Sequence, residues 1–531
     1  MPNEDVDAIV VGAGFAGLYM LHQLRSHGIS ARVIEAGDGV GGTWYWNRYP
    51  GARCDVESLE YSYGFDDDLQ AEWEWTERYA SQPEILRYLN HVADRFDLRR
   101  DIQLCTRVTS ATFDETTDRW SVTTDAGDER SARFVIMATG CLSSANVPEI
   151  KGIDSFGGPT YHTGRWPHEG VDFSGTRVGV IGTGSSAVQS IPIIAREAEQ
   201  LVVFQRTATY SVPARNAPID PAEVAEVKAD YPGLRRRNRR TMGGFGSRSV
   251  PPELSALEVD DVTRQTAFEQ RWERGGLGFL GAFTDVIIAQ QANETAAEFV
   301  RDKIVEIVED PAVAAKLLPR QVIGCKRLCI DSGYYETFNR PNVRLVDLGE
   351  SPIEEITPTG VRISDEDVPL DCIVFATGFD AMTGALLNID IRGRGDVPLR
   401  DAWSAGPRTY LGLGVPGFPN LFTITGPGSP SVLTNMVTSI EQHVEWIAQC
   451  IADLRATGHA TIEASESDAD EWVAYVNSVA SFTLFPNCNS WYLGANVPGK
   501  PRVFMPLLGF APYADRCAQV AADGYTGFVL A

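Results

Sequence analysis

Positive charge is scarce in this chain. Lys and Arg number 46 against 71 Asp and Glu, which gives a formal net charge of −25. An acidic surface of this kind repels nucleic acid and anionic membranes, so neither is expected as a partner. The one basic run, Arg235 to Arg240, is interpreted as the solvated face of a helix.

Long apolar runs and cysteine pairs are also missing. No stretch of about 18 apolar residues occurs, and the first residues lack the basic and apolar regions of a signal peptide, so a cytoplasmic protein is expected. The nine cysteines, from Cys54 to Cys517, form no Cys-x-x-Cys pair. Cys325 and Cys329 have no histidine cluster nearby, so no metal site is predicted. All the cysteines are expected to be free thiols.

Two segments of the sequence are each predicted to form a strand, a glycine loop, a helix and a second strand, in that order. In the first, Gly12-x-Gly14-x-x-Gly17 follows "DAIVV", and Glu35 ends the next strand, "ARVIEA". The glycines allow a tight turn and close approach of a pyrophosphate to a helix N-terminus. The Glu35 carboxylate can bind both ribose hydroxyls and would repel a 2′-phosphate. A second glycine pair follows in "GGTW", where the backbone can approach a long dinucleotide again, so FAD is predicted here.

The second segment predicts an NADPH site. After "VGVI", its loop consists of Gly182, Thr183, Gly184, Ser185, Ser186 and Ala187. The following strand ends at Gln205 and Arg206, where an NAD site would have an acidic residue; an arginine there can pair with a 2′-phosphate. One chain with FAD and NADPH sites indicates a flavin-dependent oxidoreductase. Cys54 is the only cysteine near the predicted flavin, so an oxygenase is favoured over a disulfide reductase.

Two matching strands predict how the domains are connected. "FVIMATG" ends at Gly140, and "IVFATGFD" ends at Asp380, which would mark two crossings between domains. The prediction is an α/β fold with two Rossmann-like dinucleotide-binding domains, the NADP domain nested within the FAD domain. We expect an FAD-binding domain at 1–141 and 380–531, an NADP-binding domain at 142–212 and 321–379, and a helical insertion at 213–320.

The stretch "FGGPTYHTGRWP" narrows the family. It matches the fingerprint of type I Baeyer–Villiger monooxygenases at Phe156, Gly158, His162, Trp166 and Pro167. Flavin monooxygenases that oxidise nitrogen or sulfur are similar up to the histidine but usually lack the Trp-Pro ending. Further segments, among them "SWYLGANVPGKPRVFMP", extend the resemblance over essentially the whole chain. "PGARCD" and "GPGSPSVLTNM" resemble the phenylacetone and steroid monooxygenase subgroup most.

The resemblance also implies roles for individual residues. Arg327 matches the active-site arginine and Asp55 the aspartate that pairs with it; Lys326 would help Arg206 hold the 2′-phosphate. His162 is interpreted as a hinge residue rather than a base. The substrate pocket would be lined by Leu433, Met436 and Trp491. Cofactor contacts are further expected at Ala16, Thr43, Trp44, Trp46, Arg53, Asp55, Tyr61, Val108, Gln189, Thr207, Arg327, Met436 and Trp491.

The activity implied by this resemblance is oxygen insertion next to a ketone carbonyl. NADPH would reduce FAD, the reduced flavin would react with O2 to form a C4a-peroxyflavin, and its attack on an aryl, cyclic or steroid ketone would give an ester or lactone. Two alternatives stay open: a flavin monooxygenase that oxidises nitrogen or sulfur, and an electron carrier similar to the disulfide reductases. No obligate protein partner is evident from the sequence.

Overall fold

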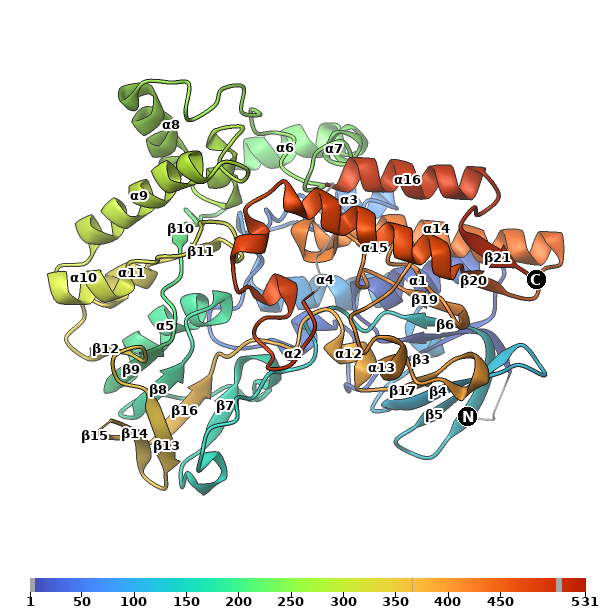
Figure 1. Cartoon of the computed structure of the whole chain (residues 1–531), viewed down its shortest axis with the longest axis horizontal. Coiled ribbons are helices and arrows are strands. Elements are labelled where there is room, and N and C mark those ends of the chain that lie inside the picture. The colour runs from blue at the N-terminus through green and yellow to red at the C-terminus, as the bar shows by residue number, and fades with distance from the viewer. Residues whose placement is uncertain (1–4, 365, 503–508) are drawn as a thin grey trace.

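The computed structural model describes residues 5–364, 366–502 and 509–531, and two large sheets organise it (Figure 1). The larger sheet has nine strands in the order β17-β4-β5-β6-β1-β2-β3, with β19 joined to β6 and β18 to β19. Its strands are β1 (Val6–Val11), β2 (Ala31–Ile34), β3 (Ile102–Gln103), β4 (Val108–Asp114), β5 (Arg119–Thr124), β6 (Glu129–Met137), β17 (Asp390–Arg392), β18 (Gly414–Val415) and β19 (Phe418–Thr423).

The centre of this sheet is parallel and buried. β1 lies between β2 and β6, and Val11 is opposite Met137. The helices α1 (Phe15–Ser26) and α14 (Met436–Thr457) pack against each other beside the sheet. The remaining elements of this part are α2 (Thr43–Trp46), α3 (Asp67–Glu72), α4 (Gln82–Arg95), α12 (Gly384–Leu387), α13 (Leu399–Ala402), α15 (Glu466–Ser481), α16 (Phe510–Ala522), β20 (Ile462–Ala464) and β21 (Phe528–Leu530).

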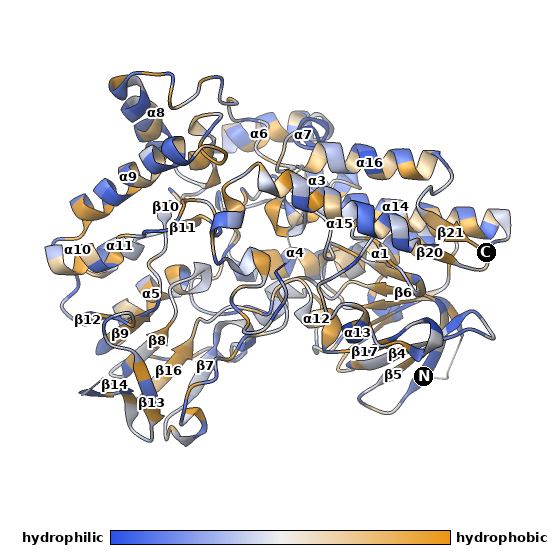
Figure 2. Cartoon of the chain, in the orientation of Figure 1, coloured by the Kyte–Doolittle hydropathy of each residue, from blue (hydrophilic) through white to orange (hydrophobic). Residues whose placement is uncertain are grey.

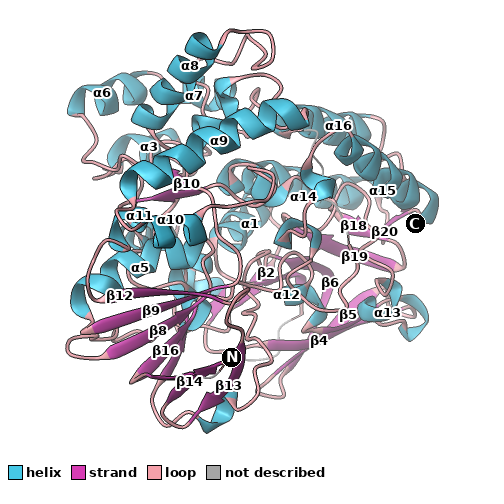
Figure 3. Ribbon diagram, turned by 60° about the vertical axis from the view of Figure 1, so that its left-hand side comes forward, coloured by secondary structure: helices cyan, strands magenta, loops and turns pink. Residues whose placement is uncertain are grey.

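The second sheet is fully parallel, in the order β12-β9-β8-β16-β7 (Figure 3). Its strands are β7 (Thr160–His162), β8 (Arg177–Ile181), β9 (Gln200–Gln205), β12 (Val343–Asp347) and β16 (Cys372–Phe375). One face packs against α5 (Ser185–Glu197), the other against an antiparallel meander of β13 (Ile353–Thr357), β14 (Gly360–Ile363) and β15 (Glu366–Pro369). Cover on both faces explains why the central strands β8, β9 and β16 are mainly apolar and buried.

The connectivity confirms the predicted nesting of one dinucleotide fold in the other. Every strand of the parallel sheet lies between β6 and β17 in the chain, and both of those strands belong to the larger sheet. The parallel sheet is therefore an insertion, entered after Met137 and left after Phe375. The domain boundaries given above remain a prediction.

The segment predicted as a helical insertion is mostly helical. It contains α6 (Pro221–Ala229), α7 (Tyr231–Asn238), α8 (Asp261–Arg274), α9 (Gln290–Ile307) and α10 (Pro311–Leu317). Asp220, Asp260 and Asp310 cap the N-termini of α6, α8 and α10, each accepting a hydrogen bond from a first-turn amide. Figure 2 shows apolar and polar residues alternating along α8 and α9. Nearby, β10 (Ser211–Pro213) pairs with β11 (Cys329–Asp331), followed by α11 (Tyr334–Thr337).

The basic run at the end of α7 is a solvated face only in part: Arg236, Arg237 and Arg240 are exposed, whereas Arg235 and Arg239 are partly buried. The Arg235 guanidinium donates hydrogen bonds to the Gln70 side chain (3.0 Å), the Glu60 carbonyl (2.9 Å) and Ser62 (2.7 Å). Arg239 forms an ion pair of 3.1 Å with Glu445 on α14. Arg235 and Arg239 therefore join the insertion to the layer of the larger sheet.

The described part of the chain contains neither membrane-spanning helices nor groups of metal-ligating side chains. None of its helices combines the length and apolar composition that a bilayer crossing requires. Within the same residues, His, Cys, Asp and Glu side chains form no group of three or more that could hold a metal ion.

Candidate active site

The first glycine loop forms a tight passage between β1 and α1. Gly12 has φ of 104°, and a Cβ there would lie 2.6 Å from the Ala138 carbonyl oxygen. Gly14 approaches the second glycine pair so closely that its Cβ would lie 3.2 Å from the Gly42 Cα. Ala16 and Gly17 are buried in the first turn of α1, whose N-cap, Gly14, has no capping side chain. The first-turn amides of a helix opened in this way suit a pyrophosphate.

Glu35 lies at the end of β2, beside this loop. Its carboxylate is 5% exposed and accepts hydrogen bonds from the backbone amides of Ala13 (2.7 Å) and Gly37 (2.8 Å). These bonds fix the carboxylate next to the glycines and leave acceptor positions for ribose hydroxyls. The backbone cradle and the oriented acid therefore fit an FAD molecule.

The predicted flavin-side aromatics come together around the start of α1. Trp44 donates a hydrogen bond from Nε1 to the Tyr61 hydroxyl (3.2 Å), and Tyr61 packs edge-on against Phe15. Thr43 and Trp46 share α2 with Trp44. Val108 is apart from this group: it begins β4 and is buried in a separate apolar cluster on the larger sheet.

The second glycine loop is held by bonds to neighbouring segments. Thr183 donates a hydrogen bond to the Thr207 carbonyl (2.8 Å), Ser185 lies 3.3 Å from the Cys329 sulfur, and the Ser186 and Thr163 hydroxyls are 3.1 Å apart. Gly184 precedes α5, which begins at Ser185 and buries Ala187. These bonds place the N-terminus of α5 at the carboxyl end of the parallel sheet, where dinucleotides bind.

Arg206 and Lys326 reach this end of the sheet from different segments. Burial lowers the pKa of Lys326, and the positive charge of Arg206 lowers it further. Throughout the described residues, neither side chain forms an ion pair with a carboxylate. Two adjacent cations of this kind fit the 2′-phosphate of NADP.

Gln189 and Arg53, both expected to contact cofactor, also contact each other. The Gln189 side-chain amide donates a hydrogen bond to the Arg53 carbonyl (3.1 Å) and accepts one from the Tyr49 hydroxyl (2.8 Å). The Arg53 guanidinium donates to Glu77 (2.8 Å) and to the Tyr79 carbonyl (2.9 Å). These bonds join the segment after α2 to α5, and so join the two dinucleotide folds.

Arg327 and Asp55 form a bidentate pair between the two folds. The Arg327 Nε and Nη2 atoms each donate to one Asp55 carboxylate oxygen at 2.8 Å, and Nη1 donates to the Val432 carbonyl at 2.8 Å. Burial on its own would lower the pKa of Arg327, but the Asp55 charge and the Tyr492 hydroxyl outweigh it and raise this pKa. The site therefore contains a permanent, oriented cation.

The fingerprint stretch lies along the crossing between the folds. His162 ends β7; its Nδ1 accepts a hydrogen bond from the Gly164 amide (2.9 Å), and Nε2 lies 3.4 Å from the Thr377 hydroxyl. Burial lowers the pKa of His162, so the ring is neutral at pH 7.

The other fingerprint residues have packing roles. Trp166 is buried against Tyr161 and Phe173. Phe156 packs on the meander, Gly158 lies against the Asp371 carbonyl, and Pro167 borders a surface groove with Arg48 and Gln82.

Leu433, Met436 and Trp491, expected to line a substrate pocket, belong to one apolar cluster. Cys141, Val432 and Tyr492 form its buried part. Tyr492 also borders a cavity of about 310 Å³, whose wall includes Met382, Trp403, Pro427 and Val497. The sequence reasoning did not single out Tyr492 or Val432. Tyr492 could have been found from its place next to Trp491, whereas a backbone carbonyl such as that of Val432 leaves no trace in a sequence.

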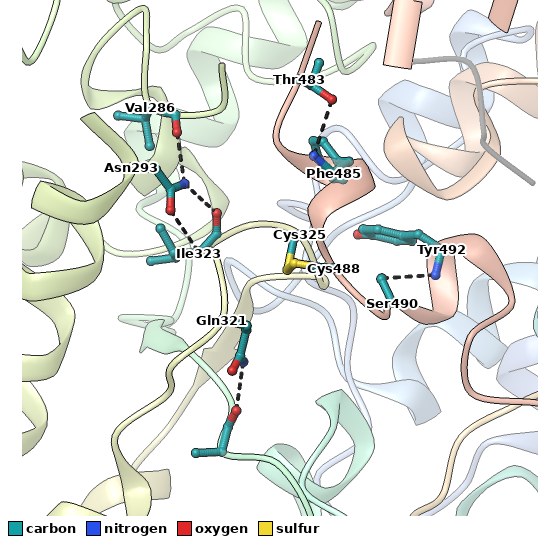
Figure 4. The surroundings of a disulfide bond; sticks show 11 residues. Val286, Asn293, Gln321, Ile323, Cys325, Thr483, Phe485, Cys488, Ser490 and Tyr492 are labelled. Carbon is teal, nitrogen blue, oxygen red and sulfur yellow. Dashed lines mark hydrogen bonds between the residues drawn. A yellow bond between two sulfur atoms is a disulfide. The ribbon is translucent and has the colours of Figure 1, made fainter. Parts of the chain in front are cut away.

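The expectation that every cysteine is a free thiol was wrong for two of them. Cys325 and Cys488 form a disulfide across 163 residues of chain (Figure 4). The fold brings the loop before Arg327 against the segment before Trp491, a proximity that spacing along the chain does not reveal. The other cysteines are free, as predicted: Cys54, Cys105, Cys141, Cys329, Cys372, Cys450 and Cys517.

Two nested dinucleotide folds with an arginine–aspartate pair between them define an oxidoreductase that binds FAD and NADP. In agreement, the family model "Pyridine nucleotide-disulphide oxidoreductase" matches residues 9–228. A Baeyer–Villiger monooxygenase from Pseudooceanicola batsensis is 45% identical over 99% of this chain and 96% of its own. The structure titled "Oxidized steroid monooxygenase bound to NADP" is 55% identical with a TM-score of 0.94, covering 99% of both chains. A complex of OTEMO with FAD and NADP is 41% identical with a TM-score of 0.95, covering 100% of both. The chain belongs to the Baeyer–Villiger monooxygenase family, as its fingerprint stretch predicted.

Proposed function

We propose that this protein uses NADPH and O2 to insert one oxygen atom next to a ketone carbonyl, giving an ester or lactone. The observation that carries the proposal is the partly buried Arg327–Asp55 pair, held at 2.8 Å by two parallel hydrogen bonds where the two dinucleotide folds meet. Oxygen transfer to a ketone passes through an oxyanion, and a fixed guanidinium stabilises such a charge more strongly in a buried site than in water.

Bound FAD and NADPH supply the electron transfer and the oxygen activation. The chain's part is to hold them: Glu35 and the Gly12–Gly17 loop for FAD, Arg206 and Lys326 for the NADP 2′-phosphate. Arg327 stays protonated and would stabilise the negative charge that develops on oxygen. Asp55 fixes its plane and balances its charge until negative charge develops on oxygen. The apolar cluster of Leu433, Met436 and Trp491 excludes water from this place.

The substrate class follows from the apolar lining. The cluster of Val432, Tyr492 and their neighbours and the adjoining cavity of about 310 Å³ suit an apolar ketone. Aryl, cyclic and steroid ketones meet this description. We further propose a cytoplasmic enzyme, because its co-substrate is NADPH.

Product analysis tests the proposal and its alternative together. Purified protein with FAD, NADPH and O2 is offered a panel of aryl, cyclic and steroid ketones beside tertiary amines and thioethers. Esters or lactones from the ketones, formed in proportion to the NADPH consumed, are the expected result. Exclusive formation of N-oxides or sulfoxides would make the enzyme a nitrogen- or sulfur-oxidising flavin monooxygenase instead.

A further inference from the structure

Two loops far apart in the sequence meet at Arg327. The first carries Cys325, two residues before the arginine, and the second carries Cys488, four residues before Tyr492. The disulfide joins them with a Cα–Cα distance of 6.2 Å. The segment 488–492, which we call the tethered segment, is therefore attached covalently to the loop that carries the active-site cation.

Both ends of this connection are themselves fixed. On the arginine side, Asn293 of α9 donates its side-chain amide to the Val286 and Ile323 carbonyls (both 2.9 Å) and accepts from the Ile323 amide (3.2 Å) (Figure 4). In the tethered segment, the fully buried Ser490 hydroxyl accepts from the Tyr492 amide (3.2 Å) and starts a short helical turn there. The disulfide thus joins two ordered pieces of backbone rather than two loose loops.

Tyr492 lies in the same buried apolar cluster as Val432, whose carbonyl binds the Arg327 guanidinium. Tyr492 is 6% exposed, and its ring extends toward the Cys325–Cys488 disulfide in Figure 4. Asp55 binds one edge of Arg327 and the Val432 carbonyl binds Nη1. The Tyr492 hydroxyl is close enough to Arg327 to raise the pKa of the guanidinium. Burial raises the pKa of Tyr492 to about 12, so the phenol stays neutral.

We propose that Tyr492 is a positioning residue for Arg327, and that the Cys325–Cys488 disulfide holds Tyr492 in that position. This inference rests on the proposed role of Arg327 in oxygen transfer. Asp55 holds the guanidinium along one edge, and the Val432 carbonyl holds Nη1. The buried Tyr492 ring, in one cluster with Val432, would limit movement of the guanidinium on its remaining side. Loss of the phenol or of the tether lets the cation move away from the developing oxyanion while the cofactor sites stay intact.

The tether also makes this position sensitive to redox conditions. A dithiol attacks one sulfur of the disulfide, the S–S bond breaks, and a mixed disulfide forms; the second thiol then displaces the other cysteine. Two electrons and two protons pass to Cys325 and Cys488, and the reagent leaves as its cyclic disulfide. Disulfides are uncommon in the cytosol and are often regulatory there.

The first readout is the partition of NADPH between ester and hydrogen peroxide. For Tyr492→Phe, and for Cys488→Ser, we expect anaerobic flavin reduction within about twofold of wild type and ester yield per NADPH at least fivefold lower, with hydrogen peroxide making up the difference. Wild type treated with a dithiol, then freed of it, should behave like Cys488→Ser, which itself should not respond to the dithiol. Tyr475→Phe, at a half-exposed tyrosine, and Cys105→Ser, at an exposed free cysteine, are the matched controls.

The second readout is the crystal structure of each variant, which does not depend on the reaction. We expect the Arg327 guanidinium to lose its bond to Val432 or its bidentate contact with Asp55 in Tyr492→Phe and Cys488→Ser. An unmoved guanidinium together with wild-type ester yield in both variants would overturn the inference. If wild type makes no ester at all, the proposed function fails, and the position of Arg327 in these structures still decides the role of Tyr492.

Discussion

At the residue scale, the proposed oxygen transfer depends on Arg327, a cation that cannot lose its proton. Arg327 is bound on three of its nitrogen atoms, by Asp55 and by the Val432 carbonyl. A lysine would supply charge without the two parallel bonds, since its ammonium is a point donor. The arginine and aspartate could be predicted from the family's motifs, whereas Val432 could not, because it acts through its backbone.

Replacing Arg327 should separate the two halves of the reaction. We expect Arg327→Ala to allow reduction of the flavin by NADPH but to lower ester formation by about 100-fold or more, the size typical for loss of an oxyanion-stabilising group. The rate of ester formation by Arg327→Lys should lie between those of wild type and Arg327→Ala. Stopped-flow reduction and product yield measure the two steps. Normal ester formation by the alanine variant would remove Arg327 from the role.

Arg206 should discriminate between the two nicotinamide cofactors. Loss of its charge-assisted bond to the 2′-phosphate is expected to raise the KM for NADPH by about 10- to 100-fold in Arg206→Ala. The KM for NADH should change little, because NADH has no such phosphate. Steady-state kinetics with both cofactors, with the exposed Arg236→Ala as control, measure this. Equal effects on NADPH and NADH would argue against phosphate recognition.

At the scale of elements, the contacts of α7 could not be predicted from the sequence. The glycine loops, the parallel strands and the helical insertion follow from local patterns, since turns, apolar runs and helix caps act over a few residues. A run of arginines carries no such local signal. Whether Arg235 faces water or Gln70 and Ser62 depends on which layer packs against the helix. The same holds for Cys325 and Cys488, which only the folded chain brings together.

Stability measurements should confirm that α7 is joined to the larger sheet's layer through Arg235. Arg235→Ala leaves the Glu60 carbonyl and the Ser62 hydroxyl without this donor, and we expect it to lower the free energy of unfolding by about 2 kcal/mol. Arg236→Ala, at an exposed position on the same helix, should change it by less than about 0.5 kcal/mol. Chemical denaturation measures both variants. Equal stability of the two would mean that the Arg235 bonds do not hold α7 to this layer.

At the scale of the whole molecule, buried neutral histidines make stability depend on pH. His443 on α14 accepts a hydrogen bond from the Thr425 amide on Nδ1 (2.9 Å), and burial lowers its pKa to about 3. Below about pH 6.5, His443 binds a proton in the unfolded chain but stays neutral in the folded chain. The contribution of His443 is therefore complete above about pH 7 and is lost as the pH falls from about 6.5 toward 3.

The expected size of this effect is about 2 kcal/mol between pH 7.5 and pH 5. His443→Asn keeps an acceptor near Thr425 but cannot titrate. It should be less stable than wild type at pH 7.5, yet lose about 2 kcal/mol less on going to pH 5. The exposed His27→Gln should follow the wild-type profile. Parallel pH profiles of wild type and His443→Asn would show that His443 titrates normally in the folded protein.

Isotope labelling measures whether this protein transfers an oxygen atom from O2 to a ketone. Purified protein with FAD is supplied with NADPH, ¹⁸O2 and each ketone of the panel in turn, and the products are analysed by mass spectrometry. We expect an ester or lactone with a single ¹⁸O atom from at least one ketone, formed in proportion to the NADPH oxidised and lowered by about 100-fold or more in Arg327→Ala. Oxidation of NADPH that yields only hydrogen peroxide with every ketone of the panel would contradict the proposed function.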